Sequence, residues 1–317
     1  MSEYGGVDDL IGDISGSYPI AARAMSEYIE DDYERSVREV GPTEYITGTG
    51  IEIVRPLRAG TPPAHVVFDF DGTLSLVREG WPDVMVPMMV EALLETGTRE
   101  SPEALARIAQ DFVMKLNGKQ TIYQMIRLAE EIAKRGGTPA EPAAYKQRYH
   151  ERLMERIGAR REGLASGAIA AESLLVPGSR AILDLLCARG VAVYLASGTD
   201  ERYVREEAEL LAIADYFEGR IYGAVDDYKS FSKARVIERI LRDNAVDGAE
   251  LLGFGDGYVE ILNIKSAGGT AVAVASDESA RSGKPDAWKR DRLIGVGADI
   301  VIPDFADAAA LVEYLWR

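Results

Sequence analysis

Short apolar runs alternate with amphipathic segments through the second half of the chain, and this alternation predicts the fold. Helical periodicity is found at 179–188, 201–211, 233–243, 259–267 and 306–316. Between these segments lie apolar runs of strand length, at 191–196, 220–225, 251–254, 270–275 and 299–302. Strands that alternate with helices of this length are joined by right-handed crossovers in a parallel sheet. We therefore expect an α/β fold.

One more apolar run, Val66–Phe68, lies far upstream of the others. Residues 76–175, which follow it, contain helical patterns and no strand pattern, with Ser101 and Pro102 as a typical helix start. The expected helices span 82–95, 101–116, 121–135, 145–157 and 162–174. The sheet domain is thus predicted to consist of residues 61–75 and 176–317, with residues 76–175 inserted as an all-helical domain.

Residues 1–60 have the weakest pattern. Residues 20–40 are acidic, carry a partial helical stripe and stop at Gly41-Pro42, and residues 51–54 alternate like a short strand. The segment is an N-terminal extension of unknown role. A structural brace for the core is our interpretation, and a dimer contact or a cover over the site are the alternatives.

The composition restricts the partners. The 317 residues carry a formal net charge of −16, which argues against nucleic acid or an anionic membrane as a partner. An anionic substrate therefore requires local positive charge or a metal. No apolar stretch approaches the roughly 20 residues of a membrane helix, and the start of the chain lacks signal-peptide features. We expect a cytoplasmic protein of undetermined oligomeric state, whose single cysteine, Cys187, is a small core residue.

Two carboxylates follow the first apolar run. Asp69 and Asp71 come directly after Phe68, and Gly72 then breaks the strand pattern. In an open α/β sheet, ligands bind beyond the carboxyl ends of the strands. Because the chain turns at Gly72, the two side chains can be aimed differently. One acid could then attack a substrate while the other transfers protons.

The sequence Asp69-Phe70-Asp71-Gly72-Thr73 resembles DxDGT, the first motif of the haloacid dehalogenase superfamily. The resemblance extends over residues 64–302 through four motifs in order, with a phosphoglycolate-phosphatase-like layout. It implies a three-layer, Rossmann-like parallel-sheet core with an inserted helical cap. It also implies Asp69 as the nucleophile, Asp71 as general acid/base, and Gly72 and Thr73 near the phosphate.

A serine and two backbone amides follow the apolar run 191–196. A hydroxyl beside exposed N–H groups at the end of a strand suits a phosphate oxygen, although a simple helix cap is the alternative. The position of Ser197-Gly198-Thr199 matches the second motif of the superfamily. The resemblance therefore implies Ser197 and Gly198 as phosphate ligands.

A lysine is needed to offset the negative charge of a phosphoryl group that binds beside two carboxylates, because like charges at close range oppose binding. Lys229 and Lys233 are the candidates. Lys233 opens a predicted helix and lies 23 residues before Asp256, which is similar to the third motif. We therefore prefer Lys233, and Lys229 is interpreted as a solvated loop charge.

The run 251–260 ends a strand in a glycine turn that presents Asp256, and Glu260 follows one helical turn later. Oxygen ligands on separate strand ends suit Mg²⁺. The resemblance to the fourth motif implies Asp256 as a direct Mg²⁺ ligand, beside the Asp69 carboxylate and the Asp71 backbone carbonyl. Glu260 would act through water or as an outer ligand.

The same run also mimics a dinucleotide fingerprint, with Gly253 and Gly255 after a strand and Asp277 after the next one. The third glycine position holds Tyr258, and Asp256 would face the pyrophosphate, so this alternative is disfavoured.

The function predicted from these residues is an Mg²⁺-dependent phosphatase for a small phosphorylated metabolite, acting through an aspartyl phosphate. A phosphomutase with the same apparatus and a non-catalytic phosphate-binding regulatory protein are the alternatives. Within the inserted helices, four residues are candidates for substrate contact, with packing or solvated turns as the alternative interpretation: Trp81, Lys119, Gln120 and Gln124.

Overall fold

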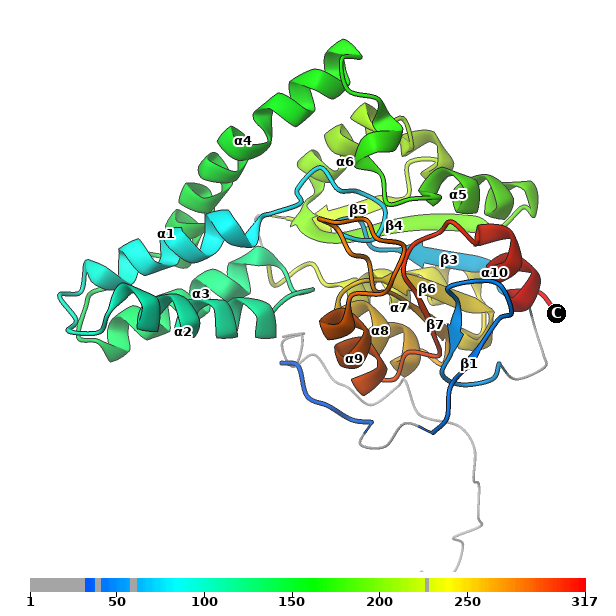
Figure 1. Cartoon of the computed structure of the whole chain (residues 1–317), viewed down its shortest axis with the longest axis horizontal. Helices are drawn as coiled ribbons and strands as arrows, with labels where there is room; N and C mark the ends of the chain where they lie inside the picture. Colours follow the sequence, from blue (N-terminus) through cyan, green and yellow to red (C-terminus); the bar gives the residue numbers. More distant parts are fainter. Residues whose placement is uncertain (1–31, 38–40, 58–61, 226–227) are drawn as a thin grey trace, which may run out of the picture.

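A sheet of eight strands forms the centre of the molecule (Figure 1). The computed structural model describes residues 32–37, 41–57, 62–225 and 228–317. The strand order is β1-β2-β8-β7-β6-β3-β4-β5, and β3 to β8 are parallel, as predicted. The parallel strands are β3 (His65–Phe68), β4 (Ala192–Asp200), β5 (Ile221–Ala224), β6 (Leu251–Gly255), β7 (Thr270–Val274) and β8 (Ile300–Ile302).

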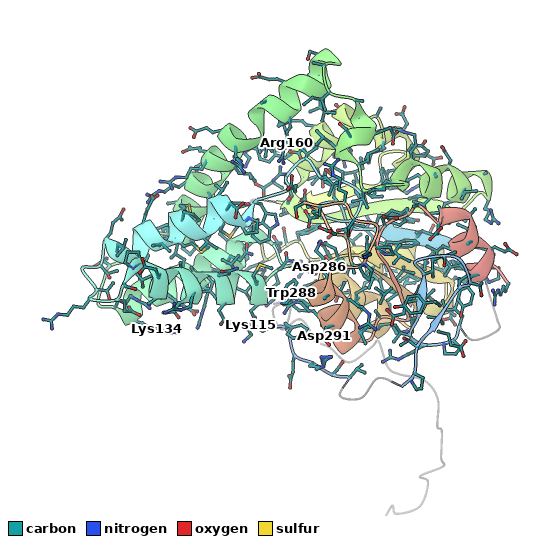
Figure 2. The ribbon with its side chains drawn as sticks, in the orientation of Figure 1. Lys115, Lys134, Arg160, Asp286, Trp288 and Asp291 are labelled. Carbon is teal, nitrogen blue, oxygen red and sulfur yellow. The ribbon has the colours of Figure 1, made fainter. Side chains whose placement is uncertain are left out.

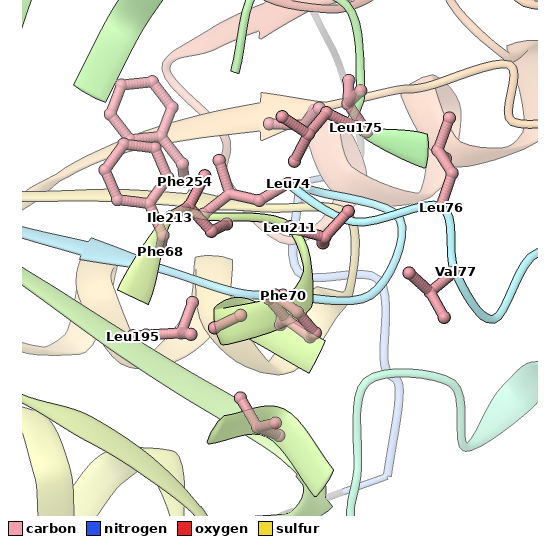
Figure 3. Packing of buried hydrophobic residues seen from close by; sticks show 14 of the residues in the cluster. Phe68, Phe70, Leu74, Leu76, Val77, Leu175, Leu195, Leu211, Ile213 and Phe254 are labelled. Atoms are coloured by element: carbon pink, nitrogen blue, oxygen red, sulfur yellow. The ribbon is translucent and has the colours of Figure 1, made fainter. Parts of the chain in front are cut away.

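Helices cover both faces of this sheet, because the central strand β3 is apolar on both sides. Val66 and Phe68 pack toward α5 (Ser179–Ala188), α6 (Glu201–Leu210) and α10 (Ala308–Leu315). Val67 packs on the opposite face, toward α7 (Lys233–Asn244), α8 (Tyr258–Ser266) and α9 (Ala287–Gly295). Figure 3 shows the first cluster, in which the rings of Phe68 and Phe254 stack with centroids 4.7 Å apart. The core is therefore a three-layer α/β arrangement.

Four α-helices follow β3 and extend away from the sheet (Figure 1): α1 (Pro82–Leu94), α2 (Pro102–Lys115), α3 (Thr121–Lys134) and α4 (Pro142–Ser166). The first three match the predicted helices, and the Ser101 hydroxyl accepts a hydrogen bond from Ala104 N at 3.2 Å, as a cap does.

The prediction of two helices over 145–157 and 162–174 is wrong. The single helix α4 runs through Gly158, and a 3₁₀ turn, Ala171–Leu174, follows it. The buried residues Leu153, Ile157 and Leu164 continue one face across Gly158, and that packing outweighs the roughly 1 kcal/mol that a glycine costs inside a helix.

The described part of the N-terminal extension runs along the core. The strand predicted at 51–54 is present as β2 (Glu52–Ile53), which pairs antiparallel with β8 and with the unpredicted β1 (Glu44–Tyr45). The prediction of a helix over 20–40 is wrong for residues 32–37, which are not helical. The other residues of that predicted helix lie outside the described residues.

Two further differences from the predictions are found in the core. Helix α9 was not predicted. Cys187 is exposed, so its assignment to the core is wrong. Ile182, Leu183 and Leu186 form the buried face of α5, and Cys187 falls beside that face. No helix within the described ranges combines the length and the apolarity that crossing a membrane requires.

Candidate active site

A cavity of about 90 Å³ lies beyond the carboxyl ends of β3, β4 and β6. These strands are neighbours in the sheet, so the residues at or just after their carboxyl ends converge although they are far apart in sequence. The predicted site residues that line the cavity are Asp69, Asp71, Gly72, Trp81, Lys119, Gln124, Ser197, Gly198, Lys233 and Asp256. Thr73, Gln120 and Glu260 are not among the lining residues.

Asp69 is held by a buried lysine. Lys233 Nζ donates to Asp69 Oδ1 at 2.8 Å, and the same ammonium forms an ion pair with Glu260. Burial raises the pKa of Asp69, the charge of Asp256 raises it further, and Lys233 opposes both effects. Lys229 is exposed. Of the two lysines considered from the sequence, Lys233 is therefore the one beside Asp69.

Asp71 is oriented by a different partner. Thr199 Oγ1 donates to Asp71 Oδ2 at 2.8 Å. The other oxygen, Oδ1, is buried and has no hydrogen-bond partner in the described part of the chain, although Arg78 Nε lies 3.7 Å away. Burial raises the pKa of Asp71 to about 7, against the opposing charge of Arg78. The two aspartates are thus aimed at different partners, as expected for a chain that turns at Gly72.

Arg78 is a cavity residue that the sequence analysis missed. It donates from Nε and Nη2 to the fully buried Glu207 at 3.0 and 2.9 Å, and Arg161 of α4 donates to the same carboxylate at 2.8 Å. Burial lowers the pKa of Arg78, but the carboxylates of Glu207 and Asp71 together raise it overall. A sequence signal was present, because Glu207 lies on the apolar stripe of α6 between Val204 and Ala208.

Asp256 is fixed by a second lysine that was also missed. Lys289 Nζ, from α9, lies 2.9 Å from Asp256 Oδ2 and 2.6 Å from Glu278 Oε1. Burial disfavours the charged form of Lys289 and lowers its pKa, but these two carboxylates raise the pKa by more, so that it is raised overall. Gly72 has φ +73, and a Cβ there would clash with the Asp256 carboxylate. Glycine at this position allows the turn after β3 to approach Asp256 closely.

Three predicted residues support the walls of the site. Thr73 Oγ1 accepts from the backbone N–H of Asp256 at 3.0 Å, which ties the first motif to the fourth. Gln120 Nε2 donates to the carbonyls of Tyr228 and Phe231 at 3.1 and 2.9 Å. Glu260 is buried, pairs with Lys233 and is not among the residues that line the cavity.

The carboxyl-terminal part of β4, which contains Ser197, Gly198 and Thr199, lies against the helical insertion. Ser197 Oγ is buried and accepts from Thr199 N at 3.0 Å, so it stabilises its own turn beside the cavity. A Cβ on Gly198 would lie 2.9 Å from the carbonyl oxygen of Lys119. The absence of a side chain at Gly198 therefore lets the insertion pack onto the core and close the cavity.

The helical insertion supplies the remaining wall. Trp81, Lys119 and Gln124 line the cavity, and so does Tyr149, which was not predicted. Gln124 Nε2 donates to Val113 O at 3.2 Å, so that bond orients the side chain. Three of the four candidates in the insertion therefore face the cavity, and Gln120 does not.

The residues at the carboxyl end of β3 and β6 fit a divalent cation. Within the described ranges, no three His, Cys, Asp or Glu side chains form a group that could hold a metal alone. The carboxylates of Asp69 and Asp256 are nonetheless close enough that the charge of Asp256 raises the pKa of Asp69. Two carboxylates and the Asp71 carbonyl are a hard oxygen donor set of the kind Mg²⁺ takes while retaining waters. A cation there would relieve the repulsion.

Known proteins share this architecture. The family model described as haloacid dehalogenase-like hydrolase matches residues 63–268. Solved structures cover about four fifths of the chain. A predicted phosphoglycolate phosphatase from Haemophilus somnus has TM-score 0.51 and 17% identity, covering 79% of this chain and 98% of its own. A hydrolase from Pseudomonas syringae has TM-score 0.53 and 17% identity, covering 80% and 100%.

The β-phosphoglucomutase from Clostridium difficile has TM-score 0.53 and 13% identity, covering 80% of this chain and 97% of its own. No curated protein matches the sequence. At these identities, the solved structures show the likeness of the fold alone.

Proposed function

Because the chain belongs to the haloacid dehalogenase-like hydrolases, we propose that it is an Mg²⁺-dependent phosphatase for a small phosphate monoester. One observation supports this most strongly. Asp69 is held by Lys233, while Asp71 is held by Thr199 and keeps one buried oxygen, at the cavity wall, to which none of the described residues donates a hydrogen bond. Two acids with separate supports suit a nucleophile and a proton carrier.

In the first step, an oxygen of the Asp69 carboxylate attacks phosphorus, and the bond between phosphorus and the ester oxygen breaks. Asp71 donates a proton to the leaving alcohol, which departs, and an aspartyl phosphate remains on Asp69. The raised pKa of Asp71 suits this role, because a carboxyl group that titrates near neutrality carries a proton to give.

In the second step, Asp71 accepts a proton from water, and the water oxygen attacks the phosphorus of the aspartyl phosphate. Inorganic phosphate leaves and Asp69 is regenerated. Lys233 lies beside the reacting carboxylate and neutralises charge on the phosphoryl oxygens. We assign the phosphoryl oxygens to Ser197, Gly198 and the Gly72 backbone, and we assign Thr73 to the support of Asp256.

Asp69, Asp256 and the backbone carbonyl of Asp71 would hold the Mg²⁺. When bound, the ion supplies positive charge that offsets the negative charge of the phosphoryl group and of the two carboxylates beside it. Chelation with EDTA should therefore abolish hydrolysis of p-nitrophenyl phosphate, and added Mg²⁺ should restore it. Full activity in the chelator would exclude the metal from the function.

A panel of phosphate esters, assayed with Mg²⁺ in H₂¹⁸O, tests the proposal. A phosphatase places the label in free phosphate and gives no positional isomer of the substrate. Formation of an isomer in preference to free phosphate would identify a mutase. Absence of both turnover and phosphorylated protein across the panel would indicate a binding protein.

A further inference from the structure

Every described cation that lines the cavity has a carboxylate partner. Lys233 pairs with Asp69 and Glu260, and Arg78 pairs with Glu207. Lys119, the third, pairs with Asp32, whose Oδ1 lies 2.7 Å from its ammonium. The acidic lining residues are more numerous: Asp69, Asp71, Glu79, Asp256 and Glu278. Beyond the phosphoryl site, the wall therefore offers little net positive charge to a substrate.

The partner of Lys119 comes from outside the family-matched region. Asp32 belongs to the segment 32–37, which precedes residues 63–268 and which lies along α9. Arg35 forms a forked pair with Asp291 at 2.8 to 3.2 Å. The backbone N–H groups of Ser36 and Val37 both donate to the carbonyl of Gly295, at 3.0 and 2.9 Å. The segment is thus fixed to α9 by side-chain and backbone bonds.

The loop that carries Lys119 is fixed to the same part of the core. Arg292 of α9 donates to the carbonyl of Lys115 at 2.6 Å, and Tyr33 packs under that guanidinium, with its ring centroid 3.8 Å away. Figure 2 shows Lys115, at the end of α2, close to Trp288 and Asp291 of α9. Asp32 and Lys119 are therefore brought together by contacts on both sides.

The pair is asymmetric in its exposure. The Lys119 side chain is 3% exposed, whereas the Asp32 side chain is 58% exposed. The hydrogen bond from Lys119 lowers the pKa of Asp32, so the carboxylate is charged at neutral pH. Because Asp32 already neutralises the buried ammonium of Lys119, a second anion would bind to that ammonium only weakly. An anionic group of a substrate in the cavity would have to compete with Asp32 for Lys119.

We propose that Asp32 determines specificity through Lys119, so that the site accepts phosphate esters whose leaving group carries no negative charge. A small polar alcohol or an amino alcohol fits this requirement, and a hydroxy acid does not. The inference rests on the proposed phosphatase function for its kinetic test, and its binding test stands independently of turnover.

Three two-carbon esters that differ mainly in charge are the probes: phosphoglycolate, ethyl phosphate and phosphoethanolamine. Their binding constants are measured by calorimetry in the parent protein with Ca²⁺ in place of Mg²⁺, because the looser coordination that Ca²⁺ favours should prevent hydrolysis while the cavity keeps all its side chains. Phosphoglycolate should bind about tenfold more weakly than the other two. The kcat/KM values of the parent protein should show the same order.

The variant Asp32→Asn tests the residue itself. It should strengthen phosphoglycolate binding about fivefold and leave ethyl phosphate unchanged, because Lys119 is then available to an anion. Asp32→Glu keeps a carboxylate at this position, so it should keep the parent protein's weaker binding of phosphoglycolate. Glu34→Gln, an equal change of net charge on the same segment, should have no effect. The variant Lys119→Met and the double variant Lys119→Met with Asp32→Asn should bind each of the three esters equally well, because Asp32 acts through Lys119.

If Asp32 had a purely structural role, the Asp32→Asn variant would bind all three esters more weakly than the parent protein does. Preference of the parent for phosphoglycolate, or weaker phosphoglycolate binding in Asp32→Asn, would overturn the proposal, as would no binding of any of the three. If the binding order holds but no ester is hydrolysed by the parent, the specificity inference stands and the phosphatase function fails.

Discussion

Replacing Lys233 by methionine is the most informative single change at the site. The substitution keeps the length and apolar stem of the side chain and removes the ammonium. Asp69 and Glu260 are each 6% exposed, so both carboxylates would lose their shared cation in a buried environment. Removing one partner of a buried pair typically costs about 3–5 kcal/mol, and we expect a loss of that size in the free energy of unfolding.

The expected loss of activity is separate from this loss of stability. The substitution removes the ammonium that lies beside the carboxylate that receives the phosphoryl group, and one such preorganised contact is worth about 10²-fold or more in kcat. The assay is p-nitrophenyl phosphate hydrolysis with saturating Mg²⁺, together with urea unfolding of the same preparation.

Two further variants distinguish the two effects. Adding Glu260→Gln to Lys233→Met removes a carboxylate left without its cation, and it should recover part of the stability with none of the activity. Lys229→Met, an exposed control, should change neither property appreciably. Recovery of activity together with stability in the double variant, or a kcat for Lys233→Met within about threefold of the parent, would refute the assignment.

Three other predictions concern positions around the site. Thr199→Val removes the hydrogen bond to Asp71 and should slow ethyl phosphate hydrolysis by about tenfold, with a smaller effect on p-nitrophenyl phosphate, whose leaving group needs little protonation; equal effects would contradict it. Glu207→Ala leaves Arg78 buried without its main partner and should lower the free energy of unfolding by about 3 kcal/mol or more in urea titration. Gly178→Ala should destabilise by more than about 1 kcal/mol, because φ is +78 there and a Cβ would clash with a backbone carbonyl; an unchanged urea midpoint would contradict it.

The sheet and much of the site were predictable from the sequence, because strand order places the signals together. Asp69, Ser197 and Asp256 each follow an apolar run, and the carboxyl ends of parallel strands share one edge. Lys233 opens a helix on the same edge and meets Asp69 there. The roles assigned to these residues stay predictions.

The supporting residues could not be predicted, because their contacts depend on tertiary packing. Lys289 and Arg292 are buried on α9, a short helix rich in charged residues. Sequence patterns assume that Lys and Arg are exposed, and on that assumption α9 has no apolar face and is not predicted as a helix. The hydroxyl of Thr73, which is predicted to lie near the phosphate, accepts a hydrogen bond from the backbone N–H of Asp256, a contact that no local pattern signals. Asp32 reaches Lys119 across 87 residues of chain, without any local signal.

The central claim is that Asp69 carries the phosphoryl group, and trapping that intermediate tests it most directly. Asp71→Asn and Asp69→Asn are each mixed with p-nitrophenyl phosphate and Mg²⁺, quenched in acid within one turnover, and examined by intact mass and peptide mapping. We predict a burst of p-nitrophenolate and one phosphoryl group on Asp69 in Asp71→Asn, with neither in Asp69→Asn. Turnover by Asp69→Asn, or a phosphoryl group on any other residue, would contradict the account.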